Sequence, residues 1–220
     1  MQAVDASKLT LRDVHRLLHL EEQLDKSQIP ALPLEPLTEA EQQDLSKIRA
    51  DFRRYLLEEK ISEGLVKFLS LAPLLRLTGF YDVPIRLTME TSLEIIVEDE
   101  DTKISGRLDL LALSSVQYSE AGAPFWALVI ETKNSSIEVR QGLPQLLTYA
   151  HKSLNQQPIV WGVVTNGLQF LFVRLQKGNL STYHLLPELY LLDEDRSLKL
   201  VQVLKALCKL QFGSVDAIAV

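Results

Sequence analysis

Cysteine is almost absent from the sequence, since Cys208 is the only one among 220 residues. A single thiol excludes a disulfide framework within the chain and a zinc site built from several cysteines. The chain also lacks an apolar run long enough to cross a membrane, and residues 1–8 contain no apolar signal core. We therefore expect a cytoplasmic protein with no membrane partner.

An excess of positive charge is missing too. The chain has 23 Lys and Arg against 29 Asp and Glu, a formal net charge of -6, whereas proteins that bind nucleic acid unaided usually show a basic footprint. Three motifs are also missing: a G-x-x-x-x-G-K-[ST] phosphate loop, a serine-nucleophile elbow and a dinucleotide fingerprint. What remains is an ordinary globular composition, 46% hydrophobic and 24% charged.

The first quarter of the chain predicts helices. Residues 9–24 have helical periodicity behind a Thr10 cap, and Thr38–Glu41 reads as a capping box that opens a second helix. Between them, the three prolines of Gln28–Pro36 predict an extended linker. We therefore predict a helical N-terminal extension over residues 1–57. Its apolar helix faces need cover, which suggests a homodimer through these helices.

The remainder, residues 58–220, predicts one α/β domain. A helical pattern continues over residues 61–77, where Pro73 would kink the helix or mark a boundary. Apolar or alternating runs then predict strands over 82–89, 93–97, 103–113, 125–133, 159–165, 168–175 and 180–186. The acidic residues 98–101 predict a turn, Asn166–Gly167 predicts a hairpin, and residues 138–154 and 197–210 predict helices. This order suits a mixed sheet flanked by helices.

Two of these strands carry carboxylates where apolar residues are expected. Asp109 is embedded in a leucine-rich strand, and Glu131 ends the run Ala-Leu-Val-Ile-Glu, with Lys133 two residues later. Residues i and i+2 of a strand point to the same side, so Glu131 and Lys133 share one space. Burying such groups is costly unless they bind a metal or pair with one another. Asp109 is thus either a metal ligand or the partner of a cation such as Arg107 or Lys133.

This ordered set resembles the PD-(D/E)xK, or restriction-endonuclease-like, nuclease superfamily. The matching residues are Leu108–Asp109 and Glu131–Lys133, and the segment from Gln145 to Tyr149 is similar to the Q-x-x-x-Y element of some branches. The resemblance is closest to the nuclease region of type I restriction enzyme motor subunits and covers roughly residues 58–174. It implies a restriction-endonuclease-like core and a Mg²⁺-dependent endonuclease (deoxyribonuclease) that hydrolyses DNA phosphodiester bonds, with Mn²⁺ as the alternative metal.

The resemblance also implies a role for each site residue. Asp109, Glu131 and the backbone carbonyl of Thr132 would hold the metal, and Lys133 would orient the attacking water or stabilise charge on the phosphate. Glutamates on the helix before the sheet often join such sites, and here Glu59 and Glu63 are candidates one helical turn apart. Gln141, Gln145 and Tyr149 would share a helix face, where they could bind phosphate oxygens or orient Lys133.

Other functions remain open from the sequence. The acidic net charge and the missing motor favour a catalytically inactive or partner-dependent protein that keeps the nuclease fold, binds nucleic acid or acts as a scaffold, and gains DNA affinity from a protein partner. A nuclease that acts on RNA or on single strands is the other alternative.

Overall fold

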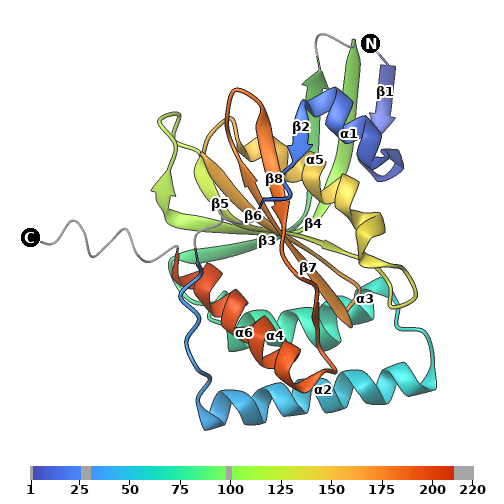
Figure 1. The fold of residues 1–220 in the computed structure, drawn as a ribbon, viewed down its shortest axis with the longest axis vertical. Coiled ribbons are helices and arrows are strands. Elements are labelled where there is room, and N and C mark those ends of the chain that lie inside the picture. The colour runs from blue at the N-terminus through green and yellow to red at the C-terminus, as the bar shows by residue number, and fades with distance from the viewer. Residues whose placement is uncertain (1, 26–30, 98–100, 211–220) are drawn as a thin grey trace, which may run out of the picture.

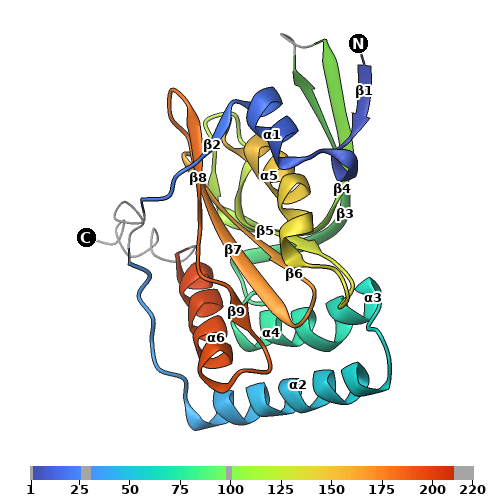
Figure 2. The same ribbon diagram turned by 45° about the vertical axis from the view of Figure 1, so that its right-hand side comes forward.

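The computed structural model describes residues 2–25, 31–97 and 101–210. Within these ranges the chain forms a nine-stranded mixed sheet with helices on both faces (Figure 1; Figure 2). This confirms the predicted α/β class with a mixed sheet flanked by helices. The elements, in chain order, are β1 Gln2–Asp5, η1 Ala6–Lys8, α1 Leu11–Leu18, β2 Leu20–Glu22, α2 Glu39–Glu58, α3 Glu63–Val66, η3 Lys67–Leu71, α4 Ala72–Leu77, β3 Ile85–Val97, β4 Thr102–Tyr118, β5 Pro124–Thr132, η5 Val139–Gly142, α5 Leu143–Ser153, β6 Ile159–Thr165, β7 Gln169–Gln176, β8 Ser181–Leu185, β9 Leu189–Tyr190 and α6 Glu194–Lys209.

The sheet follows the predicted order of elements with one difference, since the strands expected over 82–89 and 93–97 form the single strand β3. β3, β4 and β5 form an antiparallel meander, and the connection through α5 brings β6 parallel to β5. The Asn166–Gly167 turn joins β6 and β7 as an antiparallel hairpin, as predicted. Gly167 has φ +85°, and a Cβ there would lie 2.5 Å from a ring carbon of Phe52, so the turn packs directly onto α2.

Two apolar cores lie on opposite faces of the sheet. One face is covered by α2, α4 and α6, and the other by α1 and α5 (Figure 1). α2 presents Leu45, Ile48 and Phe52 to the first core, whereas α1 presents Val14 and Leu17 to the second. The faces that were expected to need a second subunit are therefore covered within the chain. The predicted homodimer loses its rationale, although the oligomeric state itself stays a prediction.

The N-terminal segment differs from the predicted helical extension. The helix expected over residues 9–24 ends at Leu18, because His19 takes a left-handed conformation and Leu20 begins strand β2, which pairs in parallel with β8. Leu20 is fully buried, while Leu24 is 81% exposed and belongs to no apolar helix face. β1 pairs in parallel with β4. Sheet pairing thus overrides helical periodicity, whereas the predicted boundary at residue 58 stays a prediction.

The helical pattern over residues 61–77 is also confirmed, with one local change. The helix begins at the Ser62 cap, passes through a π-helical turn over Lys67–Leu71, and continues past Pro73 as α4. A proline removes one backbone donor and crowds the preceding turn, and a wider turn ahead of it relieves that crowding. Pro73 therefore does not end the helix, and it lies at the start of α4, where the π-helical turn gives way to α-helix.

Two predicted connections fall partly outside the described residues. These are Gln28–Pro30 of the proline-rich linker and residues 98–100 of the acidic turn. In the part of the chain that is described, no helix combines the length and the apolar character needed to cross a membrane.

The packing of α2 gives a stability prediction. Phe52 of α2 is fully buried against the Gly167 turn, so we expect Phe52→Ala to lower the free energy of unfolding by about 3–5 kcal/mol. Phe68→Ala is the matched control, because Phe68 is 73% exposed, and it should change stability by less than about 1 kcal/mol. Urea denaturation measures both. Equal losses for the two variants would contradict this packing.

Candidate active site

One edge of β4 pairs with two different strands and leaves a short unpaired stretch between them. On this edge, β1 pairs with residues 102–105 and β5 pairs from Leu110 onward. Residues 106–109 therefore pair with neither strand. A cavity of about 600 Å³ lies along this stretch. Its lining is Asp5, Ser7, Glu63, Ser92, Leu93, Glu94, Ser105, Gly106, Arg107, Asp109, Glu131, Lys133, Gln145 and Tyr149. It contains most of the residues that the sequence singled out.

Asp109 lies at a gap in the pairing of β4, on both edges of the strand. The ladder with β5 stops at the Leu110–Ile130 pair, and one more step of that register would place Asp109 opposite Glu131. On the other edge the ladder skips the position opposite Asp109, where Glu90 has φ +53°. The backbone N–H of Thr132 donates to Asp109 Oδ2 at 2.7 Å, and the Thr132 hydroxyl donates to the same oxygen at 2.8 Å. These two bonds fix the carboxylate beside the end of β5.

Glu131 is the most deeply buried carboxylate of the cavity, with 1% of the residue exposed. Its Oε1 accepts a hydrogen bond from Lys133 Nζ at 2.6 Å, whereas its Oε2 has no hydrogen-bond partner among the described residues. Burial and the negative charge of Asp109 raise the pKa of Glu131 to about 8, and the nearby Lys133 ammonium only partly opposes this rise. The positive charge near Glu131 is therefore too small to hold the pKa of its carboxyl group at the ordinary value.

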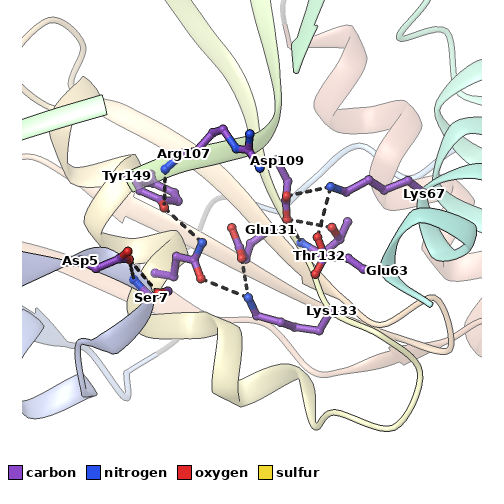
Figure 3. A network of polar contacts seen from close by, with 11 residues as sticks. Asp5, Ser7, Glu63, Lys67, Arg107, Asp109, Glu131, Thr132, Lys133 and Tyr149 are labelled. Atoms are coloured by element: carbon purple, nitrogen blue, oxygen red, sulfur yellow. Dashed lines mark hydrogen bonds and ion pairs between the residues drawn. The ribbon is translucent and has the colours of Figure 1, made fainter. Parts of the chain in front are cut away.

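Lys133 shares a space with Glu131, as strand alternation predicted, and it begins a chain of hydrogen bonds (Figure 3). Its Nζ donates to Gln145 Oε1 at 3.1 Å, and Gln145 Nε2 donates to the Tyr149 hydroxyl at 3.1 Å. The same hydroxyl accepts from the backbone N–H of Arg107 at 3.1 Å. Burial raises the pKa of Tyr149 to about 12, so this phenol stays protonated. α5 thus holds both Lys133 and the unpaired stretch of β4.

Tyr149 can reach β4 only because residue 106 is glycine. A Cβ at Gly106 would overlap the Tyr149 hydroxyl and lie 2.9 Å from a ring carbon. A second close contact occurs at Gly142, where a Cβ would lie 3.2 Å from Lys133 Cε and 2.6 Å from a Val164 methyl carbon. Both glycines give the site its close packing, which sequence motifs alone did not indicate.

Lys67 is the site residue that the sequence analysis missed. It begins the π-helical turn, and its Nζ lies 2.8 Å from Asp109 Oδ1 and 3.2 Å from Glu63 Oε1 (Figure 3). Burial lowers the pKa of Lys67, but the hydrogen bonds and charges of Asp109 and Glu63 more than offset this, so the net shift is upward. Asp109 therefore pairs with Lys67 and not with Arg107 or Lys133. The i, i+4 spacing of Glu63 and Lys67 is the signal that could have found it.

Two other candidates lie elsewhere. Glu59 is an extended residue at the end of α2, on a different helix from Glu63, so the two are not one helical turn apart. Gln141 belongs to η5 and is exposed, so the helical face shared with Gln145 and Tyr149 does not extend to it. α2 ends before Glu59, and the 3-10 turn that holds Gln141 precedes the regular helix α5. Neither Glu59 nor Gln141 is among the described residues that line the cavity.

The donors present fit a hard divalent cation. Mg²⁺ is usually bound through one or two carboxylates, with the remaining ligands coming from water and substrate phosphates. Asp109 and Glu131 supply two carboxylates, and Glu131 Oε2 is a buried oxygen with no partner in the described part of the chain. Across the described ranges, no three His, Cys, Asp or Glu side chains form a group that could hold a metal. Glu63, which was expected to add a third carboxylate, instead reaches Lys67.

Comparison with known proteins adds little to this geometry. No family model matches the sequence, and no curated protein matches it. Among solved structures, one similar chain is described as "The fragment structure of a putative HsdR subunit of a type I restriction enzyme from Vibrio vulnificus YJ016". It is 19% identical, with a TM-score of 0.38, over 70% of this chain and 26% of that chain. The protein thus spans about a quarter of that chain, and such similarity is too low to assign an activity. The class that stands on the structure itself is α/β, with an acidic cavity beside one strand of the sheet.

The raised pKa of Glu131 predicts how stability depends on pH. The folded state holds the proton up to about pH 8, whereas the unfolded carboxyl loses it near its ordinary value of 4.5. In this interval the folded state binds more protons, so the free energy of unfolding falls as pH rises, by at most about 1.4 kcal/mol per pH unit. Glu131→Gln should remove this slope when denaturation is followed between pH 5 and 8 in EDTA, while exposed Glu138→Gln should keep it. A wild-type slope retained by Glu131→Gln would contradict the assignment.

Proposed function

We propose that this protein is a metal-dependent nuclease that hydrolyses DNA phosphodiester bonds at the cavity beside β4. The observation that carries the proposal is the environment of Glu131. This buried carboxylate has one oxygen without a partner among the residues described, lies across from Asp109, and is hydrogen-bonded to Lys133. Besides the Lys133 ammonium, a second cation close to both carboxylates would stabilise the ionised form of Glu131.

The charge of the cavity supports the same requirement. Among the described residues, five carboxylates line it, from Asp5, Glu63, Glu94, Asp109 and Glu131, against the cationic side chains of Arg107 and Lys133 in the lining and of Lys67 beside it. A phosphodiester carries negative charge and is repelled by such a lining. A divalent cation held by Asp109, Glu131 and the Thr132 carbonyl would offset this repulsion, polarise the phosphate and lower the pKa of a water molecule.

The protein side chains would then share the remaining work. The Lys133 ammonium would donate a hydrogen bond to a phosphate oxygen, or orient the attacking water, and so stabilise the charge that develops on the phosphate. Gln145 holds Lys133 in that position, and Tyr149 in turn holds Gln145. Arg107 has a side chain that is 64% exposed at the rim, where it can contact a neighbouring phosphate.

Cleavage assays test this function. We expect wild type to cut plasmid or single-stranded DNA with Mg²⁺ or Mn²⁺, and Asp109→Asn and Lys133→Met to lose roughly 10²-fold or more in rate. Lys47→Met is the matched control, because Lys47 is in an exposed ion pair with Asp44 at 2.8 Å and should keep full activity. RNA is included as a substrate, since a nuclease that acts on RNA is the alternative that the sequence leaves open. Equal cutting by all variants would mean that the activity resides elsewhere.

A nucleic-acid-binding or scaffold protein without turnover is the second candidate. The pairing of Lys67 with Asp109 favours it, because an ammonium already neutralises one of the two carboxylates. Because the net charge of -6 disfavours unaided binding to DNA, such a protein would gain its DNA affinity from a protein partner. Wild type and variants that are equally inactive on every nucleic acid would favour this candidate over the nuclease.

A further inference from the structure

The ammonium of Lys67 stands where a cation bound to Asp109 would make its contact. Nζ lies 2.8 Å from Oδ1, and the side chains of Lys67 and Asp109 are only 17% and 16% exposed. The contact is therefore a partly buried ion pair of the site and not a solvent-screened surface pair.

The second oxygen of Asp109 is also engaged. Oδ2 accepts from both the backbone N–H and the hydroxyl of Thr132. Because the Thr132 amide is held at the end of β5, these two bonds are a fixed part of the sheet. Oδ1 is then the oxygen that can change partners, and its partner is Lys67.

Lys67 has a second carboxylate within reach. Glu63 Oε1 lies 3.2 Å from Nζ, four residues earlier on the same helix, and the Glu63 side chain is 44% exposed. The ammonium can leave Oδ1 and keep a charged partner, whereas Asp109 without Lys67 would need another cation. This asymmetry makes the Lys67–Asp109 contact the one that can be replaced.

We propose that Lys67 is a displaceable counter-cation, which holds Asp109 in the metal-free protein and competes with the divalent cation for Asp109 Oδ1. The inference rests on the proposed function, because it names the residue that regulates occupancy of the same metal site. Two positive charges cannot share one carboxylate oxygen closely without repulsion. Lys67 thus weakens metal binding, and it holds the site in a defined geometry until the metal arrives.

Binding of Mn²⁺ alone to the full chain, measured by isothermal titration or by the electron paramagnetic resonance of free Mn²⁺, tests this competition. We expect Lys67→Met to bind Mn²⁺ about tenfold or more tightly than wild type, because a competing charge is removed. Lys67→Gln should shift affinity in the same direction, since it keeps a donor for Oδ1 but no charge. Lys47→Met controls for the change in net charge and should bind as wild type does.

The outcomes separate this inference from the proposed function. If Asp109→Asn abolishes Mn²⁺ binding while Lys67→Met and Lys67→Gln bind no tighter than wild type, the competition is wrong and the metal site stands. If Asp109→Asn binds as well as wild type, or if neither wild type nor the folded Lys67 variants bind, both proposals are wrong. Circular dichroism melting confirms that the Lys67 variants are folded. A larger Mn²⁺-induced rise in melting temperature for Lys67→Met would support the competition independently.

Discussion

The burial of the Glu131 carboxylate across from Asp109 is the constraint on which the rest of the site depends. Glu131 lies one residue before the end of β5, in a run of buried residues, and only 1% of it is exposed. The strand ladder stops one position before the pair, and the neighbouring elements fill the space around it with donors. Lys133, Thr132 and Lys67 each bring hydrogen-bond donors to one of the two carboxylates, and Glu131 Oε2 is the oxygen that they leave without a partner among the described residues.

The two lysines come from different layers and have different relations to the sheet. Lys133 follows β5 and is held from α5 through Gln145, which places it in the layer that also carries Tyr149 (Figure 3). Lys67 comes from the helix on the other face and starts its π-helical turn, a feature that often marks functional positions. One lysine is therefore fixed by the scaffold, whereas the other has an alternative partner in Glu63. A site built in this way can exchange a cation without rearranging its strands.

Sequence reasoning succeeded where the signal was local or periodic. The period-2 alternation put Glu131 and Lys133 in one space, the Asn166–Gly167 turn gave the hairpin, and the proline near the start of α5 located that helix. The i, i+4 spacing could have paired Lys67 with Glu63, but the contact of Lys67 with Asp109 spans 42 residues and depends on how a helix packs against the sheet. The edge strand β2 was hidden for the same reason: its residues continue a helical pattern, and only the pairing with β8 turns them into a strand.

Diffraction from crystals soaked in Mn²⁺ tests the central claim most directly, since the anomalous signal locates the ion without any assumption about activity. The account predicts one Mn²⁺ ion between the carboxylates of Asp109 and Glu131, with Lys67 Nζ moved away from Asp109 Oδ1 toward Glu63. A cavity without an anomalous peak at saturating Mn²⁺, with the Lys67–Asp109 pair intact, would contradict it. In that case the buried carboxylates would be a purely structural network, and the protein would have to act by other means.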